Sequence, residues 1–161
     1  MLYENYEQVV ANVKKACERS GRNFQDITII AVSKTKPLSD VEELLSHGVM
    51  EFGENKVQEM VDKYEHVSKP VHWHLIGHLQ TNKVKYIVDK ACLIHSVDSV
   101  HLAKEIEKEA AKKGVVAKVL LEVNIAQEET KFGIREDEVY ALIDAIKDLS
   151  LIHISEPTRP Y

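Results

Sequence analysis

The feature that most constrains the fold of this chain is a repeated order of short apolar segments and amphipathic segments. Residues 27–32 are apolar and β-branched, as expected for a strand covered on both faces. The apolar positions after them recur at helical spacing until Gly48. Four further strand–helix pairs follow in the same order, with expected bounds 49–52 and 54–67, 71–76 and 81–88, 91–96 and 99–113, and 117–125 and 135–149. Five such units predict an α/β fold with parallel strands and right-handed crossovers.

An amphipathic helix over residues 3–19, ending near Gly21, is predicted before the first unit. The spacing of the units fits either a doubly wound sheet or a (β/α)₈ barrel. The loop after the first strand, residues 33–37, reads SKTKP and matches neither a GxGxxG turn nor a Walker loop. A nucleotide-binding Rossmann domain therefore loses its main support.

Composition narrows the class of protein further. The 161 residues are 44% hydrophobic, enough to bury one core. The net charge of −5 comes from interspersed acidic and basic residues, which predicts neither a nucleic-acid partner nor an anionic membrane surface. The sequence has no run of about 18 apolar residues and no apolar signal region, so we expect a cytoplasmic protein. Cys17 and Cys92 lack CxxC spacing and are expected to be buried thiols.

Lys34 is the first candidate for chemistry, because it follows the first predicted strand. The carboxyl ends of parallel strands are the edge where barrels and open α/β sheets place their ligands. A lysine amine attacks a carbonyl only in its neutral form, which burial or a neighbouring cation favours, and Lys36 could supply that cation. Without further context, an exposed surface lysine is the more common role.

Several segments change that interpretation, since they occur together in one order at predicted strand ends. They closely resemble the pyridoxal-phosphate homeostasis protein family, also called YggS or PROSC, and the resemblance covers about residues 4–148. The segments are 31–37 (AVSKTKP), 52–59 (FGENKVQE), 73–83 (WHLIGHLQTNK), 94–99 (IHSVDS), and 122–125 (EVNI) followed by 131–133 (KFG).

The resemblance implies a fold and a cofactor site. It implies a (β/α)₈ TIM barrel like the N-terminal domain of alanine racemase, of which residues 1–148 would supply the N-terminal helix and five of eight units. It also implies pyridoxal 5'-phosphate (PLP) bound as a Schiff base to Lys34, with Lys36 close by. Asn55 would hydrogen-bond the ring substituents and His74 would line or polarise the pocket. A helix N-cap is the alternative role for Asn55.

The implied function is PLP binding and homeostasis, with supply of the cofactor to PLP-dependent apo-enzymes and no catalytic reaction. One alternative is a PLP-dependent amino-acid racemase-like enzyme, which needs a second base on the opposite face of the ring. Another is a truncated fragment without function, because the family's phosphate-holding loops follow later strands and this sequence stops before them. We accordingly expect weak PLP binding.

No metal site is predicted. His72 and His74 share one face of a predicted strand, and His78 follows nearby. The sequence HLIGH lacks the glutamate of HExxH, and no acidic or cysteine partner stands near in the sequence.

The end of the chain does not continue the pattern. Residues 149–159 resemble the translation of a transposase adapter used in sequencing libraries, and prolines at 157 and 160 disfavour a strand. We therefore expect the native sequence to end at about Asp148, with residues 149–161 as a non-native tail.

Overall fold

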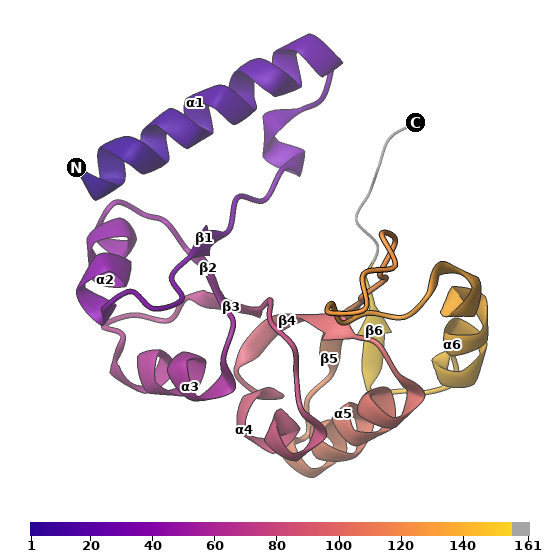
Figure 1. Cartoon of the computed structure of the whole chain (residues 1–161). Helices are drawn as coiled ribbons and strands as arrows, with labels where there is room; N and C mark the ends of the chain where they lie inside the picture. Colours follow the sequence, from indigo (N-terminus) through magenta and orange to yellow (C-terminus); the bar gives the residue numbers. More distant parts are fainter. Residues whose placement is uncertain (156–161) are drawn as a thin grey trace.

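A parallel sheet of six strands forms the centre of the protein in the computed structural model, which describes residues 1–155 (Figure 1). The strands lie side by side in chain order, each hydrogen-bonded to the next. In register, Val32 is opposite Gly53, and Gly53 is opposite His74. The strands are β1 (Ala31–Val32), β2 (Glu51–Glu54), β3 (His72–Leu75), β4 (Ala91–Val97), β5 (Ala117–Leu121) and β6 (Ile152–Ile154).

Helices α2 to α6 cover one face of this sheet. Figure 1 shows the sheet as an arc with α2 to α6 along its convex side, while α1 lies beyond the concave side. The α-helices are α1 (Leu2–Ser20), α2 (Leu38–Ser46), α3 (Val57–His66), α4 (Val84–Ile87), α5 (Val100–Lys113) and α6 (Val139–Ile146). Short 3-10 turns are η1 (Phe24–Asp26), η2 (Thr81–Lys83) and η3 (Glu136–Glu138). Sequential parallel strands with helices on the outside confirm the predicted partial (β/α)₈ barrel.

The core lies between the sheet and the convex layer of helices. Side chains alternate along a strand, so Phe52 of β2 and Trp73 and Leu75 of β3 all point into this layer and are buried. The rings of Phe52 and Trp73 have centroids 5.9 Å apart. The opposite alternation places Gly53 and His74 on the concave face.

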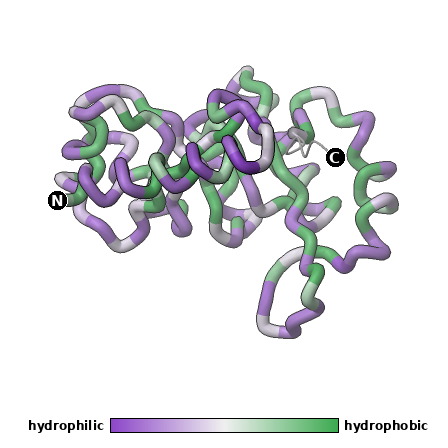
Figure 2. The backbone as a smooth tube through the Cα atoms, turned by 90° about the horizontal axis from the view of Figure 1, so that it is seen from above, coloured by the Kyte–Doolittle hydropathy of each residue, from purple (hydrophilic) through white to green (hydrophobic). Residues whose placement is uncertain are grey.

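The first helix is attached mainly through its beginning. Tyr3 and Tyr6 pack against the core, and α1 contacts α2. Figure 2 shows hydrophilic and hydrophobic residues interspersed along α1, as the amphipathic pattern predicted. Gly21 ends the helix with a left-handed φ of 69°, a conformation that costs glycine little. Cys17 is buried as expected, whereas Cys92 is only partly buried.

Two expectations about strands were wrong. The first strand spans only two residues, because among residues 1–155 β1 has a single neighbour and pairs with β2 only at Ala31 and Val32. A sixth strand, β6, forms where we expected none, with Ala117 opposite Ile152. Its alternating isoleucines on either side of His153 fit a strand.

Strand β6 lies inside the segment that we predicted to be a non-native tail. The boundary at Asp148 stays a prediction, and prolines 157 and 160 lie outside the described residues. Among residues 1–155, no helix combines the length and hydropathy that a membrane span requires.

Candidate functional site

Lys34 sits in a tight turn at the carboxyl end of β1. The Lys36 amide donates to the Ser33 carbonyl at 3.0 Å, which closes the turn. Thr35 has a φ of 61°, a left-handed conformation that is strained for a β-branched residue. The side chains of Lys34 and Lys36 are exposed. The turn therefore presents the Lys34 amine at the edge of the sheet where barrels bind ligands.

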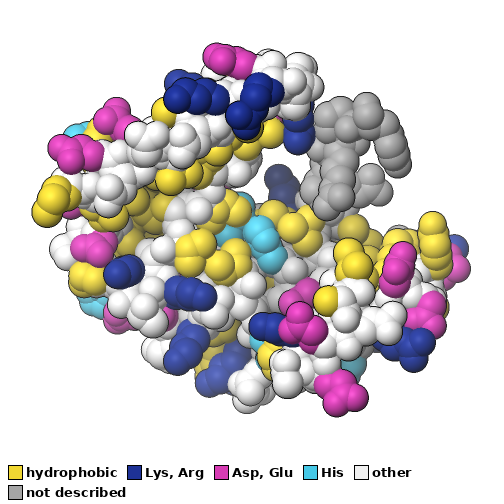
Figure 3. Space-filling view, turned by 45° about the horizontal axis from the view of Figure 1, so that its top comes forward, with side chains coloured by type: hydrophobic (Ala, Val, Ile, Leu, Met, Phe, Trp, Pro, Cys, Tyr) yellow, Lys and Arg dark blue, Asp and Glu magenta, His cyan; other side chains and the backbone are white. Residues whose placement is uncertain are grey.

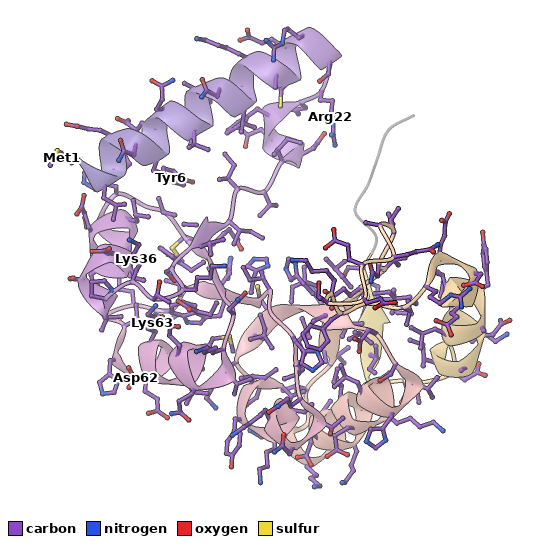
Figure 4. All side chains as sticks on the ribbon, viewed as in Figure 1. Met1, Tyr6, Arg22, Lys36, Asp62 and Lys63 are labelled. Atoms are coloured by element: carbon purple, nitrogen blue, oxygen red, sulfur yellow. The ribbon has the colours of Figure 1, made fainter. Side chains whose placement is uncertain are left out.

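A buried ionic network lies beneath this turn and contacts it on both sides of Lys34. The Ser33 hydroxyl donates to the fully buried Glu54 carboxylate, and the Thr35 amide donates to Glu59 at 2.6 Å. Lys63 of α3 joins the two carboxylates, at 2.6 Å from Glu54 and 2.9 Å from Glu59. Figure 4 labels Lys63 on α3 and Lys36 in the turn. One buried cation thus fixes both neighbours of Lys34.

The two lysines are suited to different tasks. The Lys63 ammonium also donates to the Ser33 carbonyl at 2.7 Å, so its three N–H donors have three acceptors. Burial acts to raise the pKa of the Glu59 carboxyl, but hydrogen bonds from Lys63 and the Thr35 amide outweigh it and lower the pKa. All three N–H donors of Lys63 are used in these structural hydrogen bonds. The exposed Lys34 amine, in contrast, is accessible to a ligand.

Asn55 lies at the same edge, directly after β2. It lines a cavity of about 270 Å³ together with Lys56, His78 and Gln80. The N-cap of α3 is Lys56, so the alternative role of Asn55 as that cap is wrong. A Cβ atom on Gly77 would collide with the Asn55 carbonyl oxygen, which explains why a glycine follows β3 here. The structure brings Asn55 and Lys34 to one edge of the sheet.

His74 lies deeper than the other three predicted site residues. It is level with Val32 in the sheet, two residues before Lys34. Its ring is buried, with Nε2 at 2.7 Å from a Glu51 oxygen and Nδ1 at 2.9 Å from His95 Nε2. Both ring nitrogens therefore have protein partners. Figure 3 shows histidine and apolar side chains together in the hollow of the concave face.

Glu51 and Cys92 complete this second cluster. Burial acts to raise the pKa of Glu51, but hydrogen bonds with His74 and His72 lower it. Burial, followed by the Glu51 charge, raises the pKa of the Cys92 thiol to about 11. The expectation that no acidic or cysteine partner lies near the histidines is wrong. The sheet brings Glu51 and Cys92 close to His74.

Comparison with known proteins places the chain in a family. Residues 5–156 match the family described as alanine racemase, N-terminal domain. The chain is also 41% identical over 171 residues to the pyridoxal phosphate homeostasis protein of Aquifex aeolicus (strain VF5), covering 98% of this chain and 75% of that protein. The chain belongs to the pyridoxal phosphate homeostasis protein family. The resemblance seen in its segments is thereby confirmed.

Solved structures agree with this family membership. A structure described as an unknown protein from Bifidobacterium adolescentis superposes with a TM-score of 0.86 at 28% identity, over 95% of this chain and 66% of that chain. PipY of Synechococcus elongatus PCC7942, solved with PLP bound, superposes with a TM-score of 0.74 at 29% identity, over 94% of this chain and 72% of that chain. The fold shared with these two proteins therefore extends over nearly the whole chain.

The sequence did not predict the role of the carboxylates beneath the Lys34 turn, Glu54 and Glu59. Glu54 and Glu59 stood inside a segment that carried the resemblance, but nothing in the sequence paired them with Ser33 or Thr35. One signal was present, since Glu59 and Lys63 have the i,i+4 spacing of a helical ion pair. Glu51 and Cys92 gave no such signal, because 40 intervening residues separate them.

Proposed function

We propose that this chain binds PLP at the carboxyl edge of its sheet, with Lys34 as the residue that holds the cofactor as a Schiff base. The observation that carries the proposal is the fixed turn around an exposed lysine, with Ser33 and Thr35 held through Lys63. Family membership and the relative solved with PLP bound support it. When bound, PLP supplies an aldehyde that condenses with a lysine amine.

The site residues divide the work between them. Lys34 supplies the amine. The hydrogen bonds that hold Ser33 and Thr35 restrict the positions that this amine can occupy. The exposed Lys36 adds positive charge beside it, which attracts an anionic ligand. Asn55 offers an amide at the same edge for the polar substituents of the ring. His74 supports the pocket from the layer below, through its bonds to Glu51 and His95.

The role that we propose is that of a carrier, which binds PLP reversibly and supplies it to PLP-dependent apo-enzymes. The name of the relatives concerns homeostasis and not a reaction. A racemase-like activity would require a second base facing the ring. Incubation of the PLP-loaded chain with L-alanine separates the two roles, since formation of D-alanine would favour the enzyme.

Reductive trapping tests the anchor directly. The chain is incubated with PLP, reduced with borohydride, digested and mapped by mass spectrometry, so that even a short-lived linkage is recorded. The cofactor mass is expected on Lys34, and its loss in Lys34→Ala but not in Lys104→Ala would support the proposal. Lys104 is a matched exposed control on α5. Equal trapping in Lys34→Ala would refute Lys34 as the anchor.

A further inference from the structure

The second cluster extends from His74, level with Val32, toward the amino-terminal ends of the strands, and it contains three residue types that bind metals. Glu51 is the first residue of β2, His74 belongs to β3, and Cys92 is the second residue of β4. One carboxylate oxygen, one ring nitrogen and the sulfur lie within 4.8 Å of one another. Three adjacent hydrogen-bonded strands hold these residues, so the spacing is set by the sheet.

The donor set suits one kind of cation. Zn²⁺ binds carboxylate oxygen, imidazole nitrogen and thiolate sulfur, and sites with three protein ligands keep a fourth position for water. Bonds of about 2.0–2.3 Å to a common ion bring such ligand atoms roughly 3.5 Å apart. The present spacing therefore needs side-chain adjustments on the order of 1 Å, without movement of the strands.

The surroundings of the cluster also resemble those of a metal site. A metal-binding histidine usually bonds a second protein group through its other ring nitrogen, and His74 Nδ1 lies 2.9 Å from His95 Nε2. The carboxylate of Glu51 is oriented in the same way, since its other oxygen lies 2.6 Å from His72 Nδ1. Both ligands are thus held by neighbours that a bound ion would leave in place.

An approach from solvent exists at the amino-terminal ends of β3 and β4. A cavity of about 490 Å³ opens there, and its lining includes His72 and Cys92. Cys92 therefore borders a cavity that is open to solvent, and Lys34 and Asn55 lie at the other edge of the sheet. We propose that Glu51, His74 and Cys92 form a Zn²⁺ site beneath the proposed cofactor site, with His74 as the residue that the two sites share.

Cobalt titration tests this site without PLP. Co²⁺ replaces Zn²⁺ in such sites and gives a sulfur-to-cobalt charge-transfer band only when a thiolate binds it. One equivalent of Co²⁺ is expected to produce the band, and Zn²⁺ is expected to abolish it by displacement. Cys92→Ser should remove the band and weaken Zn²⁺ binding by at least about 10-fold, since the loss of even a hydrogen-bond partner of a metal ligand costs that much, and Glu51→Gln should weaken it similarly.

The matched control is Cys17→Ser, which removes the other cysteine, buried in α1, and should leave the titration unchanged. Circular dichroism confirms that each variant is folded. Absence of saturable binding at one equivalent, or a band that persists in Cys92→Ser, would overturn the proposal. Trapping of PLP on Lys34 in the Cys92→Ser variant shows that the cofactor site is intact, so the two proposals can fail independently.

Discussion

The Nζ atom of Lys63 lies 2.7 Å from the carbonyl oxygen of Ser33, the residue immediately before Lys34. The same ammonium binds Glu54 and Glu59, and Glu59 in turn accepts from Thr35, the residue immediately after Lys34. Lys63, which is buried beneath the turn, thus holds the backbone on both sides of Lys34 and positions Lys34 at the edge of the sheet. We therefore expect the loss of Lys63 to affect both the stability of the fold and the proposed binding of PLP at Lys34.

Replacement of Lys63 is expected to destabilise the fold strongly. Lys63→Met leaves the buried Glu54 carboxylate without its cation, which costs about 3–5 kcal/mol in comparable pairs. Urea denaturation measures the loss in free energy of unfolding. The exposed Lys104→Met should change it by less than about 0.5 kcal/mol. The double variant Glu54→Leu with Lys63→Met should be more stable than Lys63→Met alone, and a double variant that is less stable would contradict this account.

The backbone at Thr35 gives a second prediction. Its left-handed φ of 61° favours asparagine over a β-branched residue, so Thr35→Asn should raise the free energy of unfolding by about 1 kcal/mol. Thr35→Pro should lower it, because proline fixes φ near −65° and removes the N–H that binds Glu59. Thermal denaturation of both variants compares them directly, and the reverse order of stabilities would argue against the turn described above.

Gly77 should tolerate no side chain, since a Cβ atom there would meet the Asn55 backbone. Gly77→Ala is expected to cost about 1–3 kcal/mol through displacement of that backbone, and to weaken PLP trapping on Lys34. The control is Gly21→Asn, because an added Cβ atom there would meet no neighbouring atom within 4 Å and asparagine accepts the left-handed conformation. Equal stabilities of the two variants would show that the close approach to Asn55 is unimportant.

Acid should loosen the turn through Glu59. The folded-state pKa of Glu59 is lowered, so between its unfolded and folded values the unfolded chain binds more protons. The contribution of Glu59 is therefore fully present above its unfolded pKa of about 4.3 and is lost as pH falls through the lower folded value. Glu59→Gln should flatten the acid limb of the stability curve, measured by urea midpoints from pH 3 to 7. A limb of unchanged steepness would assign acid sensitivity to other groups.

The order of the elements and the placement of Lys34 and Asn55 could be predicted from the sequence. Apolar periodicity is a local property, and parallel strands bring their carboxyl ends to one edge whatever their exact register. The family segments then identified which lysine to consider. The short β1 and the extra β6 could not be predicted, because whether an apolar pair becomes a strand depends on the neighbour available for hydrogen bonding.

Tertiary structure alone decided the contacts beneath the site. The meeting of Lys63 with Ser33 depends on how closely α3 packs under the turn after β1, and the sequence separates them by 30 positions. The meeting of Glu51, His74 and Cys92 depends on strand register, including the irregular pairing of β3 with β4. Periodicity specifies which face a side chain takes, whereas distances between faces are set only when the whole sheet and its helices pack together.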